Sequence, residues 1–349
     1  AYAVTAGPGD DKTGYERPDY RTRSLSLAVR YGRPMDLLAN LRNPPLGLPP
    51  VPVPTDAAVT PEKVAIGRKL FFDRRLSLNG TVSCAMCHIP EQGFTSNEMA
   101  TAVGFEGRTV RRNAPTIFNS GYFTRLFHDG REYSLESQIW GPLLAANEMA
   151  NPSVGSVISK LRQLRDYQGL FETAFDGRGP GMETLGMALA SYQRTLLAGD
   201  SAFDRWYYAG EETALSEPEK RGFALFTGKA GCVSCHSVGD EFSLFTDNGM
   251  HNTGIGYHAS MQREPESRAV TVARGDVLEV PRSVIDSVSE RPHNDLGLYE
   301  VTQNPADRWK YRTPTLRNLT LTAPYMHDGS LGTLREVVEY YNRGGVPNE

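Results

Sequence analysis

The sequence predicts a mainly α-helical protein with little β structure, built from two similar modules in tandem. Apolar residues recur with helical spacing in several segments, whereas alternating strand patterns are scarce. A Gly-x-x-Leu-Phe helix pattern occurs twice, starting at Gly67 and at Gly222, and each copy runs through a short loop into a Cys-x-x-Cys-His motif. The 349 residues leave room for about two domains.

The composition is that of an ordinary globular protein and excludes several classes of function. Lys and Arg number 37 against 41 Asp and Glu, which gives a net charge of −4, so no nucleic-acid partner is expected. The longest uncharged stretches, such as residues 43–55, are interrupted by prolines and are too short to cross a bilayer. Membrane insertion is therefore not expected either.

The first 57 residues are expected to form an extension in front of the modules. They are polar and irregular up to about residue 43, and six prolines then fall within residues 44–54. This density of proline favours an extended polyproline strap. Interleaved Val and Leu favour a strap packed on the protein over a ligand for a proline-binding domain.

Each module is expected to begin with a capped helix. Thr60 suits the N-cap of the first helix and Pro61 its first position, while Ser216 and Glu219 form a capping box for the second. Residues 237–312 are loop-dominated, with a short hairpin expected between residues 270 and 280. Three apolar stripes predict further helices: Val154, Val157, Ile158, Leu161 and Leu164; Leu185, Leu189, Tyr192 and Leu196; and Leu331, Leu334, Val337, Val338 and Tyr341, with Tyr341 on a buried face.

The four cysteines form two pairs, and each pair is followed at once by a histidine. Cysteines three residues apart place both thiols on one side of a helical turn, where they can bond to the two vinyl groups of a haem. The adjacent histidine then points its imidazole at the iron. The motif residues are Cys84, Cys87 and His88, and Cys232, Cys235 and His236.

Three other uses of a cysteine pair compete with haem attachment: a redox dithiol, half of a zinc site and a structural disulfide. A redox dithiol does not explain the adjacent histidine. A zinc site with four cysteine ligands would need the pairs to converge across 148 residues, and it would leave both histidines without a role. The sequence therefore predicts two covalently bound c-type haems.

The haems define the expected domains, location and reactivity. We expect an N-terminal extension (1–57), followed by two cytochrome c-like helical domains (58–205 and 206–349) with one haem each. Haem attachment in bacteria takes place outside the cytoplasmic membrane, which predicts a periplasmic protein. An open position opposite His88 or His236 permits peroxide chemistry, whereas a second protein ligand is typical of electron-transfer haems.

In its ordered motifs the chain resembles the bacterial di-haem cytochrome c peroxidase family, which includes MauG, over about residues 58–345. The motifs are residues 66–77 before the first haem motif; 112–116, 129–131, 141–142 and 147–149 between the two haem motifs; and 316–318 and 321–329 after the second.

The resemblance implies an enzyme in which hydrogen peroxide reacts at a high-spin haem held by His88. Glu148 and Gln138 match the acid and the amide on the open side of this haem. A carboxylate in a partly buried pocket can move a proton from the inner to the outer oxygen of peroxide and so assist cleavage of the O–O bond.

The resemblance also implies one calcium ion between the haems. Asn113, Thr322 and Pro324 match the positions whose side-chain amide oxygen or backbone carbonyls bind it. Such hard oxygen ligands, completed by water, suit Ca²⁺.

Two departures from the family pattern point to its MauG-like branch. Reductively activated members have a distal histidine soon after the first haem motif, but no histidine occurs between His88 and His128, so the first haem is expected to be open without prior reduction. Tyr341 stands where those members have a methionine as sixth ligand of the second haem. A phenolate ligand stabilises oxidised iron, which suits storage of an oxidising equivalent.

A third departure concerns the coupling between the haems. The family has a tryptophan before Asp-Gly-Arg, where this chain has His128. Either His128 or another aromatic residue such as Trp140 is expected to take that role. Pro142 and His327 are also expected near the haems, with His327 close to the second haem but not its axial ligand.

The interpretation is a periplasmic di-haem enzyme in which peroxide oxidises the His88 haem to a high-valent state and the His236/Tyr341 haem shares the second oxidising equivalent. The expected substrate is a Trp or Tyr side chain of a partner protein, as in the MauG-like branch and the similar MbnH-like enzymes of methanobactin operons. Two alternatives stay open. A cytochrome c peroxidase fed by a small donor cytochrome predicts a methionine ligand, and a non-enzymatic electron-transfer protein predicts two six-coordinate haems.

Overall fold

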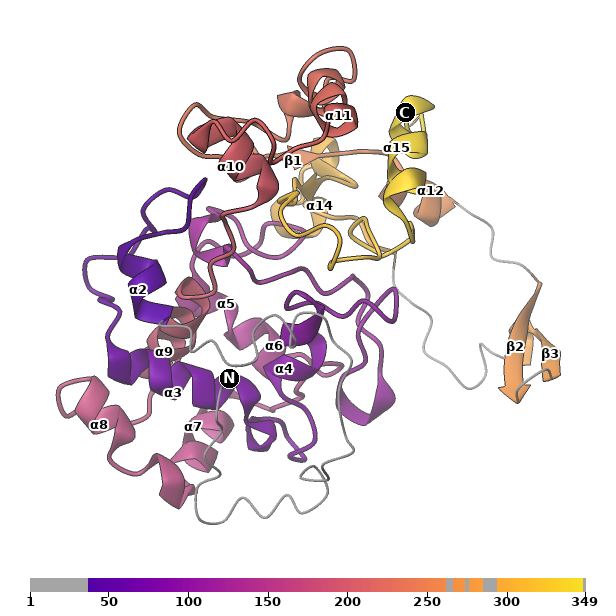
Figure 1. Ribbon diagram of the computed structural model, residues 1–349. Helices are drawn as coiled ribbons and strands as arrows, with labels where there is room; N and C mark the ends of the chain where they lie inside the picture. The colour runs from indigo at the N-terminus through magenta and orange to yellow at the C-terminus, as the bar shows by residue number, and fades with distance from the viewer. Residues whose placement is uncertain (1–36, 262–265, 274–275, 285–293, 348–349) are drawn as a thin grey trace.

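The computed structural model describes residues 37–261, 266–273, 276–284 and 294–347 (Figure 1). Helices dominate and there is little sheet, which confirms the predicted mainly helical class. The N-terminal part contains α2 (Leu37–Arg42), α3 (Pro61–Phe72), α4 (Cys84–Cys87), α5 (Leu135–Gln138), α6 (Trp140–Leu144), α7 (Val154–Gln163), α8 (Leu170–Ala174), α9 (Met182–Arg194) and α10 (Ala202–Ala209). The C-terminal part contains α11 (Glu217–Thr227), β1 (Met250–His251), α12 (Ile255–Met261), β2 (Ser267–Ala273), β3 (Asp276–Pro281), α14 (Tyr299–Thr302), β4 (Tyr311–Arg312) and α15 (Leu334–Asn342).

The main hydrophobic core lies in the N-terminal part, where α3 crosses α9. A Cβ atom on Gly67 would lie 1.9 Å from the carbonyl oxygen of Ala188, so only glycine allows the two helices to approach this closely. The predicted cap of α3 is present, because the Thr60 hydroxyl accepts a hydrogen bond from the Lys63 amide at 3.3 Å. The predicted stripes of α7 and α9 face this core, with Val157, Leu161, Leu185, Leu189, Tyr192 and Leu196 buried in it.

The C-terminal part is packed differently. The capping box of α11 forms as predicted, with the Ser216 amide donating to Glu219 Oε2 at 2.7 Å. However, neither α11 nor α15 buries a residue. The expectation that Tyr341 lies on a buried face is therefore wrong: its side chain is 50% exposed, and that of Val338 is 67% exposed. The apolar side of α15 is not covered by a partner helix in the way that the same side of α9 is covered by α3.

The proline-rich segment is a packed strap, as predicted; residues 1–36 of the extension lie outside the described residues. Leu48 is buried, and the carbonyl oxygen of Pro49 accepts a hydrogen bond from the Tyr122 hydroxyl at 2.8 Å. The Gly47 carbonyl accepts one from Arg317 at 2.8 Å. The strap therefore contacts both the N-terminal and the C-terminal parts of the chain.

The described residues also form two small antiparallel sheets. β1 pairs with β4, with Met250 opposite Arg312. β2 pairs with β3 in the predicted hairpin, which stands apart from the other elements in Figure 1 and whose turn lies outside the described residues. Among the described helices, none combines the length and the apolar character that a bilayer-spanning segment requires.

Candidate functional site

A cavity of about 500 Å³ lies behind the first Cys-x-x-Cys-His motif. Its volume falls within the roughly 300–1,000 Å³ typical of ligand and cofactor pockets. α4 places the motif on one wall, and the α5–α6 segment with the loop after it forms the facing wall. The predicted residues that line the cavity are Cys84, Cys87, His88, Asn113, His128, Gln138, Pro142 and Glu148.

The imidazole of His88 is oriented by the backbone. Its Nδ1 donates a hydrogen bond to the carbonyl oxygen of Phe94 at 3.1 Å, which leaves Nε2 free to bind a metal. Burial lowers the pKa of His88, so the ring stays neutral at physiological pH. These are the properties of a proximal haem ligand.

The thiols of the first motif are unsuited to the competing uses. Burial raises the pKa of Cys84 to about 12 and that of Cys87 to about 11. A redox dithiol has a lowered thiol pKa, so these two thiols do not fit that use. The four cysteines are free, and the structure does not gather them into one cluster within the described residues. The position of Cys84 and Cys87 on the wall of the first cavity fits thioether attachment to a haem instead.

Glu148 faces the same cavity. Burial raises the pKa of its carboxyl group, and the charge of Arg131 opposes this effect only in part. Its backbone is held close to the neighbouring loop, since the Phe105 amide donates to the Glu148 carbonyl at 2.9 Å, and a Cβ on Gly104 would lie 2.8 Å from Glu148 Cα. A carboxyl group fixed in this way can take up and release a proton inside the cavity.

The second motif repeats the geometry of the first. His236 Nδ1 donates to the carbonyl oxygen of Phe245 at 2.9 Å, as His88 does to Phe94. Both acceptor phenylalanines have a positive φ, 52° at Phe245 and 56° at Phe94. A second cavity, of about 370 Å³, is lined by Phe245, the hydrogen-bond partner of His236, but not by Cys232, Cys235 or His236 themselves. Its lining includes Phe203, Phe223, Phe226, Phe245, Leu316 and Asn318.

A second repeat, which the sequence analysis missed, relates the segments that face the motif histidines His88 and His236. His128-Asp129-Gly130 recurs 199 residues later as His327-Asp328-Gly329. Both glycines have φ of 68°, and each turn is closed by an antiparallel bridge. The N-caps Ser134 and Thr333 follow at the same spacing. The shared His-Asp-Gly sequence was the signal that could have revealed this repeat.

The same offset of 199 residues pairs Pro142 with Tyr341. Pro142 lines the first cavity. Tyr341 lies toward the second cysteine pair: partial burial raises the pKa of its phenol, and the neighbouring Tyr340, Cys235 and Cys232 raise it further. The equivalent position thus carries a side chain without a ligand atom in the first module and a phenol in the second.

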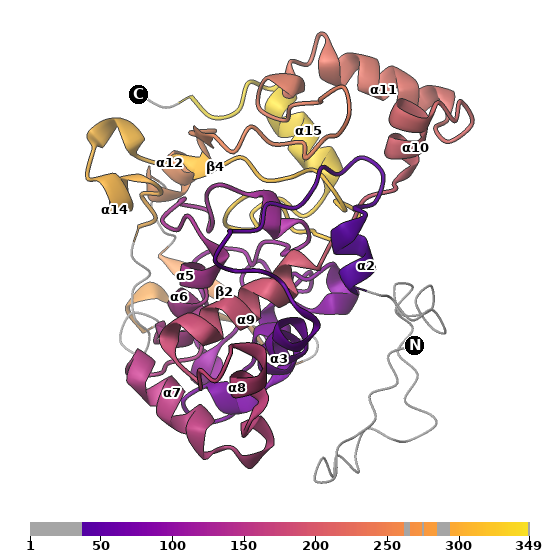
Figure 2. The same cartoon turned by 90° about the vertical axis from the view of Figure 1, so that its left-hand side faces the viewer.

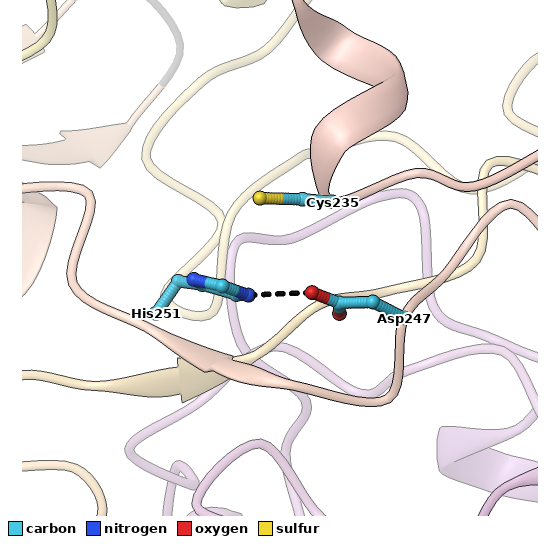
Figure 3. A group of neighbouring side chains, drawn as sticks. All are labelled: Cys235, Asp247 and His251. Atoms are coloured by element: carbon cyan, nitrogen blue, oxygen red, sulfur yellow. Dashed lines mark hydrogen bonds and ion pairs between the residues drawn. The ribbon is translucent and has the colours of Figure 1, made fainter.

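Cys235 also lies beside a hydrogen-bonded histidine–aspartate pair (Figure 3). His251 Nε2 lies 2.7 Å from Asp247 Oδ2, and the ligand atoms of all three side chains are within 4.8 Å of one another. Because Cys235 belongs to the second haem motif, this cluster is part of that site and not a separate metal centre. Burial lowers the pKa of the nearby His236, and the charge of Asp247 raises it in part.

His128 and His327 meet between the two sites through the backbone of Asn113. His128 Nε2 donates to the Asn113 carbonyl at 2.9 Å, and the Asn113 amide donates to the His327 carbonyl at 2.7 Å. Burial, with the nearby charges of His327 and Arg312, lowers the pKa of His128 to about 3, so this imidazole is neutral. Trp140, the other candidate for the inter-haem position, lies in the N-terminal hydrophobic core.

The three residues matched to a calcium site come from two neighbouring segments. Asn113 Nδ2 donates to the Ala100 carbonyl at 2.9 Å, which fixes the side-chain amide. The segment that contains Thr322 and Pro324 lies against the same region, since Asn97 Nδ2 contacts the Leu321 carbonyl at 3.4 Å. Amide and carbonyl oxygens of this kind fit calcium.

Comparisons with known proteins agree with this geometry. The model of the di-haem cytochrome c peroxidase family matches residues 61–213. Cytochrome-c peroxidase IdrP1 of Denitromonas iodatirespirans is 39% identical over 306 residues, covering 86% of this chain and 78% of that protein. The methylamine utilization protein MauG of Methylorubrum extorquens is 39% identical over 298 residues, covering 84% and 72%. A solved MauG-like protein associated with microbial copper homeostasis is 33% identical with a TM-score of 0.68, covering 88% of this chain and 83% of that one. The chain belongs to the di-haem cytochrome c peroxidase family, whose members are peroxide-reactive oxidoreductases with two c-type haems.

Proposed function

We propose that this protein uses hydrogen peroxide to oxidise Trp or Tyr side chains of a partner protein, and that it does so in the periplasm. In this proposal residues 58–205 and 206–349 each carry one covalently attached haem behind the extension 1–57. The observation that carries it is the asymmetry of the repeat: Pro142 faces the first cavity where the second module has Tyr341. A haem at each site supplies iron that reduces peroxide and retains oxidising equivalents.

In the first module, the residues of the cavity bind peroxide and transfer its proton. His88, held by Phe94, would bind the haem iron through Nε2. Pro142 lines the same cavity and has no side-chain atom that could bind the iron, so the cavity would stay open to peroxide. Glu148, whose pKa burial raises, takes the proton from the inner peroxide oxygen and returns it to the outer one. Gln138 is positioned to orient peroxide by hydrogen bonds through its side-chain amide, and His128 stays neutral beside it.

In the second module, His236 and Tyr341 would hold the iron of the second haem. The raised pKa of Tyr341 keeps its phenol protonated when no metal is bound, and a bound ferric iron would supply the positive charge that favours the phenolate. Phenolate ligation stabilises the oxidised state. In this proposal Asn113, Thr322 and Pro324 would hold a calcium ion, which would fix the region through which His128 and His327 contact the backbone of Asn113.

The alternative is a cytochrome c peroxidase that detoxifies peroxide with electrons from a small donor cytochrome. A relative named cytochrome-c peroxidase and a relative named MauG are both 39% identical to this chain, so sequence identity does not separate the two functions. The residue opposite His236 separates them, because a methionine ligand favours the reduced iron that this alternative needs and a tyrosine disfavours it.

Electron paramagnetic resonance of the haem-loaded ferric protein tests the proposal. We expect one high-spin and one low-spin signal, both lost on addition of one equivalent of peroxide without prior reduction. Two low-spin signals, with peroxide reactivity only after one-electron reduction, would reject the proposal and favour the donor-dependent peroxidase. Two low-spin signals without any peroxide reactivity would point to a non-enzymatic electron-transfer protein.

A further inference from the structure

We propose that Trp206 and Tyr207 are the relay through which oxidising equivalents leave the second haem site for a protein substrate. The inference rests on the proposed function and names the surface that this reaction uses. Both residues lie on α10, beside the cavity of about 370 Å³. This cavity reaches the second motif through Phe245, whose carbonyl accepts the hydrogen bond from His236 and whose ring lies 5.1 Å from Phe203. Indole and phenol are the side chains that lose one electron most readily.

Two phenylalanines connect this pair to the cavity. Phe203 and Phe223 both line it. The Trp206 ring meets Phe223 edge-on, with 5.4 Å between ring centroids. Tyr207 lies 5.5 Å from Phe223 and stacks on Phe203 at 5.3 Å. Trp206 and Tyr207 are themselves 5.8 Å apart. A single layer of aromatic rings thus separates two oxidisable side chains from the cavity.

The same pair reaches the protein surface. Tyr207 is 39% exposed, and Trp206 is partly buried beside it. In both views α10 and α11 lie side by side at one end of the molecule, away from the crossing of α3 and α9 (Figure 1 and Figure 2). The next residue, Tyr208, is bound inward, since its hydroxyl lies 2.5 Å from Ser243 Oγ. A partner protein therefore has direct access to Tyr207 without a change in the fold.

The redox step balances with hydrogen peroxide as the oxidant. Reduction of one peroxide to two water molecules consumes two electrons and two protons, and the partner side chain supplies both electrons, one at a time. In each transfer Trp206 or Tyr207 loses one electron to the oxidised second site and regains one from the partner. Oxidised Tyr207 releases its phenol proton to water, which its exposed side chain contacts, and recovers a proton on reduction.

A second aromatic pair provides a matched control. Tyr257 and Trp309 are in edge-on contact at 5.1 Å, and both are partly buried in the C-terminal part of the chain. Neither lines either of the two cavities described above. The pair has the same chemistry and similar burial but no ring contact with the second cavity.

The test treats the haem-loaded protein with stoichiometric peroxide in the absence of any partner and maps oxygen-addition products by peptide mass spectrometry. We expect products at Trp206 and Tyr207 and none at Tyr257 or Trp309. The double variant W206F/Y207F should lengthen the lifetime of the oxidised protein by about tenfold or more, or ~1.4 kcal/mol in activation free energy. The control variant Y257F/W309F should leave this lifetime unchanged.

Three outcomes separate the relay from the proposed function. In the first, peroxide still removes the high-spin ferric signal at the native rate, but the oxidation products map to Tyr257 and Trp309. In the second, the oxidised state of W206F/Y207F decays as fast as that of the native protein. In both cases the relay is wrong and the proposed function stands. If peroxide does not react at all, both fail. The single variants W206F and Y207F, checked by their ferric spectra, give the same comparison if the double variant does not fold.

Discussion

At the scale of single residues, burial sets the chemistry of the first site. Glu148, His88 and His128 all line one cavity, and burial favours the uncharged form of each. Both imidazole rings are therefore neutral at physiological pH, and His88 Nε2 keeps a lone pair free to bind a metal. For Glu148 it means a pKa above the ordinary value of 4.5, closer to the pH at which a proton is exchanged most efficiently.

Replacing Glu148 by glutamine should slow the reaction with peroxide by about two to four orders of magnitude, because the amide keeps the shape but cannot accept the proton. Stopped-flow spectroscopy of the first haem measures this rate. Glu106→Gln is the control, since Glu106 is exposed on a nearby loop. A loss smaller than about threefold in Glu148→Gln lies far below the general acid–base range and would remove Glu148 from the mechanism.

The same residue predicts a pH dependence. A carboxylate that takes the first proton from peroxide must be ionised, so the rate should fall as pH decreases through the pKa of Glu148. Because burial raises this pKa, the fall should be centred above 4.5 in the native protein. The Glu148→Gln variant should lose this dependence. An inflection at the same pH in both proteins would assign the titration to another group.

At the scale of elements, α15 determines the character of the second site. Tyr340 and Tyr341 are adjacent on this helix, but their side chains have different contacts. Tyr340 donates its hydroxyl to the Thr253 carbonyl at 2.5 Å, whereas Tyr341 lies toward Cys232 and Cys235. We expect Tyr341→Phe to convert the second haem from low-spin to high-spin and Tyr340→Phe to leave its spin state unchanged. Electron paramagnetic resonance of both ferric variants decides, and an unaltered low-spin signal in Tyr341→Phe would exclude it as the axial ligand.

Local sequence patterns predicted where the helices form better than they predicted which side chains are buried. The caps at Thr60 and Ser216 and the stripes of α7 and α9 were predicted correctly, because a cap or a stripe depends on a few neighbouring residues. The apolar stripe of α15 correctly predicted a helix, but its burial was predicted wrongly, because burial depends on which residues pack against the helix. The neutral state of His128 could not be predicted either, because its pKa depends first on burial and then on His327 and Arg312, which are distant in sequence.

For the site residues too, local motifs could be identified from sequence, whereas relations between distant residues could not. The haem motifs are contiguous, so their residues could be identified from sequence alone, and those of the first motif line the first cavity. The equivalence of Pro142 and Tyr341 required the His-Asp-Gly repeat, which spans 199 residues and became evident from the matching φ angles and bridges. The aromatic layer between the second cavity and Trp206 joins α10 to α11 and could not be read from either helix by itself.

At the scale of the whole molecule, one buried ion pair ties the strap to both parts of the chain. Arg317, next to the second cavity, donates to both carboxylate oxygens of Asp204 on α10 at 2.8 Å. It also donates to the carbonyls of Gly47 in the strap and Ser243, each at 2.8 Å. Asp204 is fully buried and Arg317 is 6% exposed. Each of these hydrogen bonds thus joins segments that are far apart in sequence.

This arrangement predicts a large loss of stability in Asp204→Asn. Removing one partner of a buried pair leaves the other charge uncompensated, which costs about 3–5 kcal/mol in the free energy of unfolding. The control is Asp166→Asn, whose pair with Arg75 lies at the surface and should contribute no more than about 1 kcal/mol. Urea unfolding of the haem-loaded proteins, followed by fluorescence, measures both.

The pH dependence of that loss distinguishes the ion pair from simple packing. Burial raises the pKa of Asp204, but hydrogen bonds from Arg317 and Ser201 outweigh burial and hold the pKa below its usual value. A lowered folded-state pKa stabilises the fold above the unfolded-state pKa of about 3.9, and this stabilisation is lost as the pH falls through the folded-state value. The difference between native and Asp204→Asn should therefore be complete at neutral pH and shrink below about pH 4. A difference that stays constant down to the lowest pH at which both proteins fold would mean that the asparagine side chain fails by its shape, and that the charge of Asp204 contributes nothing to joining the strap, α10 and the second site.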